Sequence, residues 1–215
     1  MLVPYKAKVY VDQEPKSNFI LMFLMVLGLL ISWLFGLRSM THFILAWENI
    51  PQSLVLVYFI HNDLFHLIGN VLFLWTFGNA INCRLGNLRF VVVFFTLGIL
   101  SSMIHLIIDG SPAIGASGAI SGIVGMFLFL FPRNDIECIF ILPWFSPIIR
   151  KFSVPGMYLI VFWFVYDLIG YFISSAPIAY MAHIGGMLCG FLLALILVKM
   201  GWITFWQSDR PLIEL

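Results

Sequence analysis

The chain has 215 residues, of which 62% are apolar and only 10% are charged, with a net charge of +1. Soluble domains are about 45–50% apolar and about 25% charged, and a small domain leaves much of its surface exposed. The composition therefore excludes a water-soluble enzyme, a disordered chain and a nucleic-acid-binding protein. It requires the lipid bilayer as the solvent for most of the molecule.

Six apolar runs follow one another along the chain, and a membrane-spanning helix needs about 20 such residues. They predict helices over Phe19–Gly36, Leu64–Ile81, Phe90–Ile108, Ser117–Phe131, 156–173 and Ile178–Val198. We therefore expect an all-α, six-helix membrane domain over residues 19–199, with short segments 1–18 and 200–215 at its ends. No cleavable signal peptide is expected, because charged residues precede the first run and no small-residue cleavage site follows it.

The basic residues orient these spans. With six spans, every Lys and Arg except Arg38 falls on one side of the membrane. Basic residues in short loops mark the cytoplasmic side, so both ends are predicted to be cytoplasmic. The segment 37–60 contains two apolar runs, and we expect it to form a structured hairpin that dips into the outer leaflet. Irregular backbone at that depth must be buried against protein or short helices.

Polar side chains are rare within membrane spans and usually mark a functional site. In this orientation, three different spans carry such residues close to their outer ends. They are His66 and Asn70 on the second span, Ser117 on the fourth and His183 on the sixth. The sequence therefore predicts one polar site near the outer face of the membrane.

The fourth span is short, at about 22 Å of helix against about 30 Å of hydrocarbon. Ser117 is thus expected to lie within the membrane, at the end of a non-helical segment that contains Gly115. The free N–H groups and the positive dipole at a helix N-terminus would stabilise an oxyanion there. Glycines four apart on the fourth and sixth spans would let the two backbones approach and bring Ser117 to His183. These glycines are Gly118, Gly122, Gly186 and Gly190.

The residue types match acyl-transfer chemistry. Ser117 can act as the nucleophile and His183 as its general base. His66 and Asn70 are four residues apart, so they share one helix face, and both can donate hydrogen bonds. Together with the backbone N–H of Ser117, they would form an oxyanion pocket.

These residues carry a family resemblance. The sequence resembles the rhomboid intramembrane serine proteases through H-x4-H-x3-N at 61–70, GxSG at 115–118 and AHxxG-x3-G at 182–190. The resemblance implies a catalytic dyad of Ser117 and His183, with His66, Asn70 and the Ser117 N–H stabilising the oxyanion. It also implies that Gly115 belongs to the turn presenting the serine and that His61 is a supporting polar group in the cleft.

The same resemblance implies that the substrates are single-span membrane proteins, which are cut in or near their transmembrane segment. It implies no cofactor, no metal and no nucleic-acid partner, and it points to a bacterial plasma membrane. The three cysteines are dispersed, so neither a disulfide nor a metal site is expected.

One departure from the family leaves a question open. Many members have a tyrosine four residues after the serine that stacks on the histidine, whereas this chain has Ser121. Another group must therefore orient His183. Asp167 in the fifth span either completes a triad with His183 or accepts a structural hydrogen bond, while His105 is expected to be structural.

Two other classes of function are compatible with a polytopic membrane protein. A catalytically silent relative would bind membrane substrates without cutting them, but it would be expected to lack Ser117 or His183, and both are present. A transporter or proton relay could use His66, Asp167 and His183. It would favour polar residues across the whole membrane depth and an internal repeat, and the sequence has neither.

Overall fold

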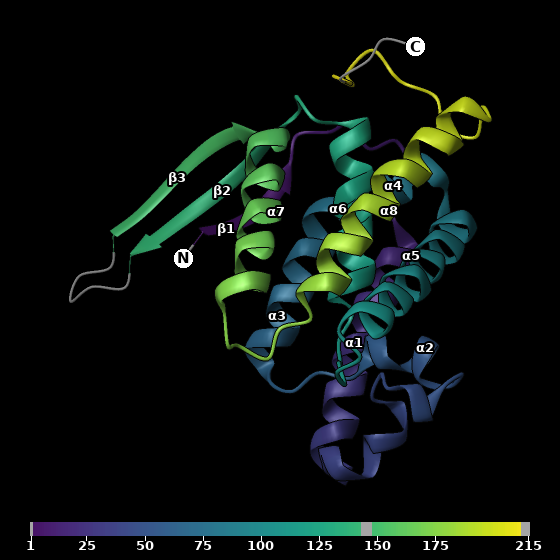
Figure 1. Ribbon diagram of the computed structural model, residues 1–215. Coiled ribbons are helices and arrows are strands. Elements are labelled where there is room, and N and C mark those ends of the chain that lie inside the picture. The colour runs from purple at the N-terminus through teal and green to yellow at the C-terminus, as the bar shows by residue number, and fades with distance from the viewer. Residues whose placement is uncertain (1, 143–147, 212–215) are drawn as a thin grey trace.

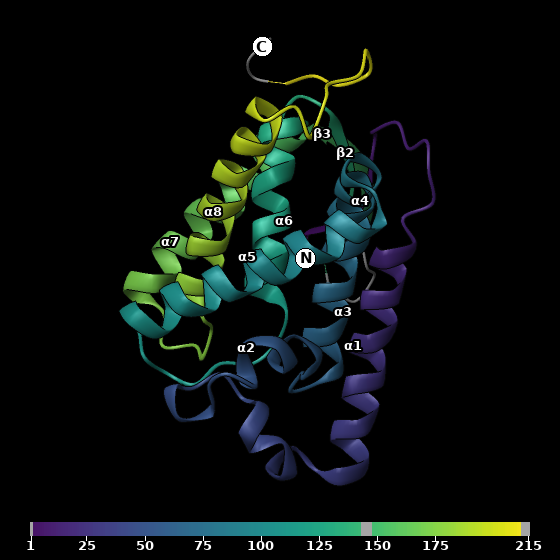
Figure 2. The same ribbon diagram turned by 90° about the vertical axis from the view of Figure 1, so that its right-hand side faces the viewer.

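The structure, a computed structural model, describes residues 2–142 and 148–211. Within these residues, five helices are long and apolar enough to cross a membrane. They are α1 (Lys16–Phe35), the continuous helix Leu64–Leu85, α5 (Asn87–Ile108), α7 (Gly156–Ile173) and α8 (Tyr180–Lys199). A shorter apolar helix, α6 (Ser117–Leu130), stands among them and is largely buried (Figures 1 and 2). The prediction of a mostly helical, polytopic membrane protein is confirmed.

The helix Leu64–Leu85 is not uniform. It consists of α3 (Leu64–Phe73), one π-helical turn η4 (Leu74–Gly78) and α4 (Asn79–Leu85). A π turn interrupts the regular hydrogen-bond ladder. The side chain of Asn18 on α1 donates to the carbonyl of Leu74 at 2.8 Å and to the amide oxygen of Asn79 at 2.8 Å. A buried amide of α1 thus supplies hydrogen bonds at this irregular point.

Helices α6 and α8 pack backbone to backbone. A Cβ atom on Gly190 would overlap the carbonyl oxygen of Gly122, and one on Gly186 would overlap that of Gly118. Likewise, a Cβ atom on Gly125 would overlap the carbonyl oxygen of Met187. Small residues permit this close approach in membranes, where dispersion and tight packing drive helix association. The contact is the one that the glycine spacing predicts, and it sets the relative height of the two helices.

The segment between α1 and α3 forms short helical turns. They are η1 (Leu37–Phe43), η2 (Trp47–Asn49), α2 (Ser53–Leu56) and η3 (Val57–Phe59). Their backbone makes local hydrogen bonds within these turns, while the expected position of the segment in the outer leaflet stays a prediction. Leu45 pairs with Ala113, and the N–H of Gly115 donates to the carbonyl of Val57 at 3.2 Å. These bonds attach the segment to the loop that precedes Ser117.

A three-stranded antiparallel sheet contradicts the expectation of an all-α protein. Its strands are β1 (Leu2–Ala7), β2 (Asp135–Leu142) and β3 (Ile148–Pro155), in the order β1-β2-β3. Strands β2 and β3 connect α6 to α7, and β1 comes from the N-terminal segment (Figure 1). Ile136 and Cys138 on β2 are fully buried in the core cluster. Burial of these side chains stabilises strand pairing where hydropathy alone indicates only a loop.

Both terminal segments dock at the end of α6 and at α4. The side-chain amide of Asn134 donates to the carbonyls of Lys8 at 3.0 Å and Ser208 at 3.2 Å. Arg84 of α4 forms a buried ion pair with Asp209, with 2.6 Å between Nη2 and Oδ1. The Arg84 guanidinium also stacks on the ring of Trp206, 3.4 Å from its centroid. One polar cluster therefore joins the two ends of the chain to the helices.

Candidate active site

Ser117 is the first residue of α6 and follows a tight turn. Gly115 has φ +101°, a conformation that favours glycine. A Cβ atom there would come within 2.7 Å of the His66 ring. Both the backbone conformation and the contact with His66 thus require glycine at this position. The turn leaves Ser117 at a helix N-terminus, where the first N–H groups lack intrahelical acceptors.

His183 lies in the first turns of α8 and faces Ser117. The distance between His183 Nε2 and Ser117 Oγ is 2.8 Å, which is a hydrogen bond. The close packing of α6 on α8, described above, brings the two side chains to this separation. A serine hydroxyl beside an imidazole nitrogen is the arrangement of a nucleophile and its base.

Asp167 of α7 lies on the other side of the same imidazole. Its Oδ2 is 3.3 Å from Nδ1 of His183, and both side chains are mostly buried. A carboxylate at this nitrogen favours the tautomer with the proton on Nδ1, which leaves the Nε2 lone pair facing Ser117. The structure therefore places serine, histidine and aspartate in one line, contributed by three helices.

His66 and Asn70 lie on the face of α3 that looks toward the turn before Ser117. The amide nitrogen of Asn70 is buried and has no hydrogen-bond partner within the described part of the chain. That nitrogen would lie 3.7 Å from a Cβ atom on Gly115. A buried donor without a partner is costly, so such a group is available to a ligand or intermediate.

These residues share one large cleft of about 860 Å³. Its walls come from α3, α6, α7 and α8, from one residue of α5, and from residues 44, 62–63, 111–114 and 176–179. Ser117, His66, Asn70, Asp167 and His183 all line it, as does Ser121. The sequence thus led to the residues that the structure gathers, although it did not settle how Asp167 is used.

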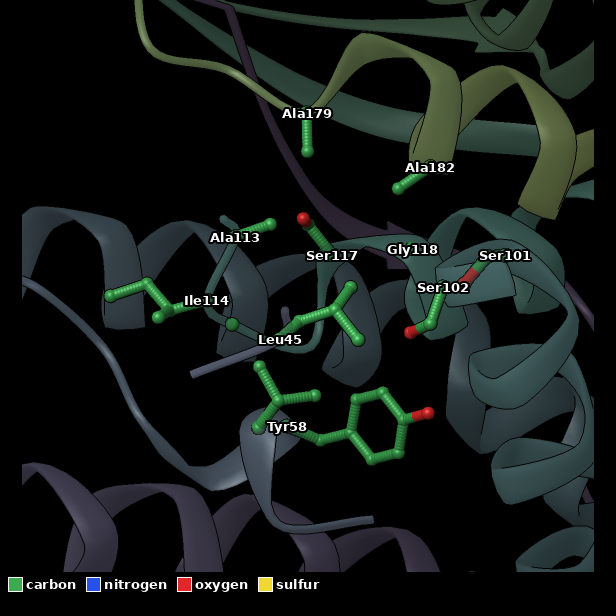
Figure 3. Close-up of a pocket in the computed structure, with 12 residues that line it drawn as sticks. Leu45, Tyr58, Ser101, Ser102, Ala113, Ile114, Ser117, Gly118, Ala179 and Ala182 are labelled. Atoms are coloured by element: carbon green, nitrogen blue, oxygen red, sulfur yellow. The ribbon is translucent and has the colours of Figure 1, made fainter. Parts of the chain in front are cut away.

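A second, small cavity of about 20 Å³ is also lined by Ser117. Figure 3 shows Tyr58, Ser101 and Ser102 lining one part of it, with Ala179 and Ala182 across from them. The Tyr58 hydroxyl is buried without a partner among the described residues. Ser117 therefore lines both the large cleft and this small cavity.

The structure places two histidines differently from the expectation: His61 lies outside the cleft, and His105 lines it. His61 is buried against His66, with the ring centroids 5.0 Å apart, and it does not line the cleft. His105 does line the cleft, and its Nε2 is 2.9 Å from the carbonyl of Ser111. Its Nδ1 is 3.0 Å from the carboxylate of Asp109. His105 thus holds the start of the loop that leads to Ser117.

The sequence did not predict the aromatic part of the cleft wall. Trp163 and Tyr166 of α7 line the cleft beside Asp167. Aromatic residues make up 17% of this chain, so composition does not distinguish those that line a site from those that face lipid. Only the rotation of α7 about its axis selects them.

The fold and site define a polytopic helical membrane protein with a serine–histidine pair inside its helical domain. The family model of the rhomboid domain matches residues 47–200. The chain belongs to the rhomboid family. The matched residues include every helix that contributes to the cleft.

Curated relatives agree with this assignment. Rhomboid protein 1, mitochondrial, of Saccharomyces cerevisiae is 29% identical over 143 residues, which are 62% of this chain and 38% of the relative. The mouse presenilin-associated rhomboid-like protein, mitochondrial, is 25% identical over 79% of this chain and 43% of its own. Rhomboid protease GluP of Bacillus subtilis is 27% identical over 69% of this chain and 25% of its own. The chain therefore spans less than half the length of these relatives.

Proposed function

We propose that this protein is an intramembrane serine endopeptidase. The observation that carries the proposal is the 2.8 Å contact between Ser117 Oγ and His183 Nε2, both of which line a large cleft. Membership of a family that includes a protein named as a rhomboid protease supports the same reaction. No cofactor or metal enters the proposed chemistry.

The first half of the reaction forms an acyl-enzyme. Ser117 Oγ attacks the carbonyl carbon of the scissile peptide bond while its proton passes to Nε2 of His183. The carbonyl oxygen becomes an oxyanion that accepts hydrogen bonds from the Ser117 N–H, His66 and Asn70. His183 then returns the proton to the leaving amine as the C–N bond breaks. In the second half, water attacks the ester carbonyl and gives one proton to His183. His183 then passes that proton to Ser117 Oγ as the ester C–O bond breaks, which releases the acid product and regenerates the Ser117 hydroxyl.

Asp167 is proposed as the positioning group for the base. Its carboxylate, 3.3 Å from Nδ1, holds the ring and stabilises the imidazolium that forms during attack. In the proposal, this carboxylate takes the place of an aromatic ring at position 121, because Ser121 cannot stack on the histidine. Gly115, Gly118, Gly186 and Gly190 support the site through the turn and the helix contact, and His61 supports it by packing on His66.

The proposed setting is a membrane domain of six spans over residues 19–199, in which α6 is the short fourth span. Both terminal segments, 1–18 and 200–215, lie in the cytoplasm, and the cleft opens toward the outer side. The proposed membrane is the bacterial plasma membrane. Substrates are single-span membrane proteins whose cleaved segment unwinds to enter the cleft between the helices.

Labelling with a serine-directed fluorophosphonate tests the proposal. In detergent or vesicles, wild-type protein is expected to react and to cleave a model single-span substrate. Ser117→Ala should lose both reactions, and His183→Ala should lose cleavage, because each removes one partner of the proton transfer. Ser121→Ala is the matched control, because it removes another serine of the same cleft and should still be labelled.

Two results would contradict the proposed peptidase activity of Ser117. A wild-type protein that binds the substrate but neither reacts nor cuts would be a catalytically silent rhomboid relative. Full cleavage by Ser117→Ala would assign the nucleophile elsewhere.

A further inference from the structure

The N-terminal strand β1 is held against the middle of the second long helix. Thr76 in the π turn η4 donates a buried hydrogen bond from Oγ1 to the carbonyl oxygen of Pro4, at 3.2 Å. The strand also packs against α3 and η4. Thr76 stands nine residues before the helix end at Leu85, which corresponds to roughly 13 Å along the axis. The strand therefore reaches the middle of a helix that is long enough to cross a membrane.

The sequence of β1 suits this position. Its first half, Leu2–Pro4, is apolar, whereas Lys6 and Lys8 follow beside the first residues of β2. Pro4 has no N–H group, and Thr76 binds its carbonyl, so this residue leaves no unpaired backbone group among the helices. The apolar half of the strand therefore enters the helical domain, while the basic residues of the N-terminal segment stay at the proposed cytoplasmic side.

The strand also lies close to the aromatic part of the cleft wall. In Figure 1 it passes behind α7, and in Figure 2 the N mark lies between α7 and α3. At this level the two helices contact each other through aromatic rings. The ring centroid of Trp163 on α7 is 4.5 Å from that of Phe73 and 6.1 Å from that of Phe77, the neighbour of Thr76. Because Phe73 and Trp163 line the cleft, β1 stands in the gap between these helices next to the cleft wall.

The attachment of β1 to the sheet is weaker than that of the other strands. Strand β2 pairs with β3 along its whole length without a register shift. The pairing of β1 with β2 is interrupted by a shift between Pro4 and Lys6, and β1 is an edge strand. Displacement of β1 would therefore leave the β2–β3 pairing intact.

We propose that β1 is an autoinhibitory strap beside the cleft. At rest, Leu2–Pro4 closes the gap between α3 and α7. A membrane-embedded substrate segment must displace this half of the strand from η4 before it can extend from Ser117 past the aromatic wall. The strand stays tethered, because the N–H of Lys8 donates to the carbonyl of Asp135 at 2.8 Å. The inference rests on the proposed function for its substrate, but the movement of β1 can be measured without catalysis.

Disulfide trapping measures this movement. Cys138 of β2 is the strand partner of both Pro4 in β1 and Phe152 in β3. Opposite residues of antiparallel strands have Cα atoms about 4.5–5.5 Å apart, which a disulfide can span. With Cys83 and Cys189 replaced by alanine, Pro4→Cys therefore permits a bond between β1 and β2. Phe152→Cys permits the matched control bond between β2 and β3.

Both variants are oxidised in lipid vesicles in a Ser117→Ala background, with and without a bound model single-span substrate. The substrate should lower the disulfide yield of Pro4→Cys roughly 3-fold or more, because it shifts the population toward the displaced strand. The yield of Phe152→Cys should not change. An unchanged yield for Pro4→Cys would overturn the proposal. An equal fall in both yields would also overturn it, because the whole sheet would then move.

With Ser117 intact, the same bond tests inhibition. Oxidised Pro4→Cys protein should cleave the membrane substrate roughly 10-fold more slowly than the reduced protein, because the competent state requires a released strap. Labelling by a small soluble fluorophosphonate should be equal in both forms. Equal cleavage by both forms would overturn the strap. Absence of labelling in every form, wild type included, would instead contradict the proposed peptidase, and the trapping yields would still decide whether β1 is displaced.

A second variant loosens the strap without a disulfide. Thr76→Val removes the hydroxyl that binds Pro4 and keeps the shape of the side chain. Cleavage should rise roughly 2- to 10-fold, the equivalent of one lost hydrogen bond. Thr76→Ser keeps the hydroxyl and should cleave at the wild-type rate. Equal rates for Thr76→Val and Thr76→Ser would show that this bond does not restrain the enzyme.

Discussion

Asp167 and Asp109 give the chain two carboxylates beside histidine Nδ1 atoms, and only one of these pairs reaches Ser117. The His183–Asp167 pair is directed at the serine hydroxyl, whereas the His105–Asp109 pair holds the loop before it. Comparing the two pairs therefore separates two effects of a carboxylate: the effect of Asp167 on the proposed base His183, and the effect of Asp109 on the structure of the loop. It also supplies a matched control within one protein.

Asp167→Asn is expected to lower kcat at pH 7 roughly 10-fold or more, with an upper limit of ~10⁴ set by triad enzymes. The amide keeps the shape but loses the charge that stabilises the imidazolium and selects its tautomer. KM should change little, because ground-state binding does not require the imidazolium. Steady-state cleavage of a membrane substrate measures both constants. Asp109→Asn should retain most of the wild-type kcat, and an equal loss in both variants would refute a specific role for Asp167.

At the scale of the element, the contact between α6 and α8 holds the proposed nucleophile and base together. Gly190→Ala would place a methyl group on the carbonyl oxygen of Gly122, so the helices must separate. Overpacking of this kind costs about 1–3 kcal/mol, and it would also lengthen the contact between Ser117 and His183. Thermal unfolding and cleavage should both report the loss.

Gly69→Ala on α3 is the control, because a Cβ atom there meets nothing within 4 Å. It should leave the stability unchanged or raise it by up to about 1 kcal/mol, as alanine favours helix over glycine. A Gly190→Ala protein as stable as wild type would mean that the helix contact is not tight.

The elements also show how far sequence alone reaches. Hydropathy located the helices to within a few residues, because crossing a membrane demands length and apolarity. It did not reveal the sheet, although Asp135-Ile136-Glu137-Cys138 alternates polar and apolar residues with the period of a strand. The partners of that strand are distant in the chain, and β1 comes from the N-terminus, so no local pattern indicated the pairing.

At the scale of the whole molecule, one buried ion pair joins Arg84 of α4 to Asp209 of the C-terminal segment. The side chains of Arg84 and Asp209 are 3% and 1% exposed. Burial raises the pKa of the Asp209 carboxyl above its ordinary value, while the nearby Arg84 guanidinium acts in the opposite direction. The attachment of the C-terminal segment to α4 therefore depends on an intact Arg84–Asp209 pair.

Arg84→Ala is expected to destabilise the protein by about 3–5 kcal/mol, because it leaves a buried carboxyl without its partner. It also removes the cation stacked on Trp206, so the tail should become sensitive to protease. Unfolding in detergent and limited proteolysis measure the two effects. Lys16→Ala, which removes a pair with Glu14 that is 68% and 80% exposed, should change stability by no more than about 1 kcal/mol. Equal losses of stability in Arg84→Ala and Lys16→Ala would contradict a stabilising role for the buried pair.

The residues of the candidate site are predictable from the sequence, but their geometry is not. Ser117, His183, His66 and Asn70 stood out because polar groups are rare in membrane spans. The distance from Asp167 to His183 depends on the rotation of α7, and no periodicity in an almost wholly apolar helix reports that rotation. The aromatic cleft wall is not predictable from the sequence for the same reason.

The π turn in the second long helix has an angular consequence. At about 100° per residue, a regular α-helix would point Asn70 and Asn82 about 120° apart. A π turn accommodates one additional residue, which reduces this angle to about 20°. Both side chains are in fact buried, Asn70 beside the cleft and Asn82 hydrogen-bonded to α1. A single helix can therefore face the interior at both of its ends, and deleting one residue from the turn would rotate one of these ends into the lipid.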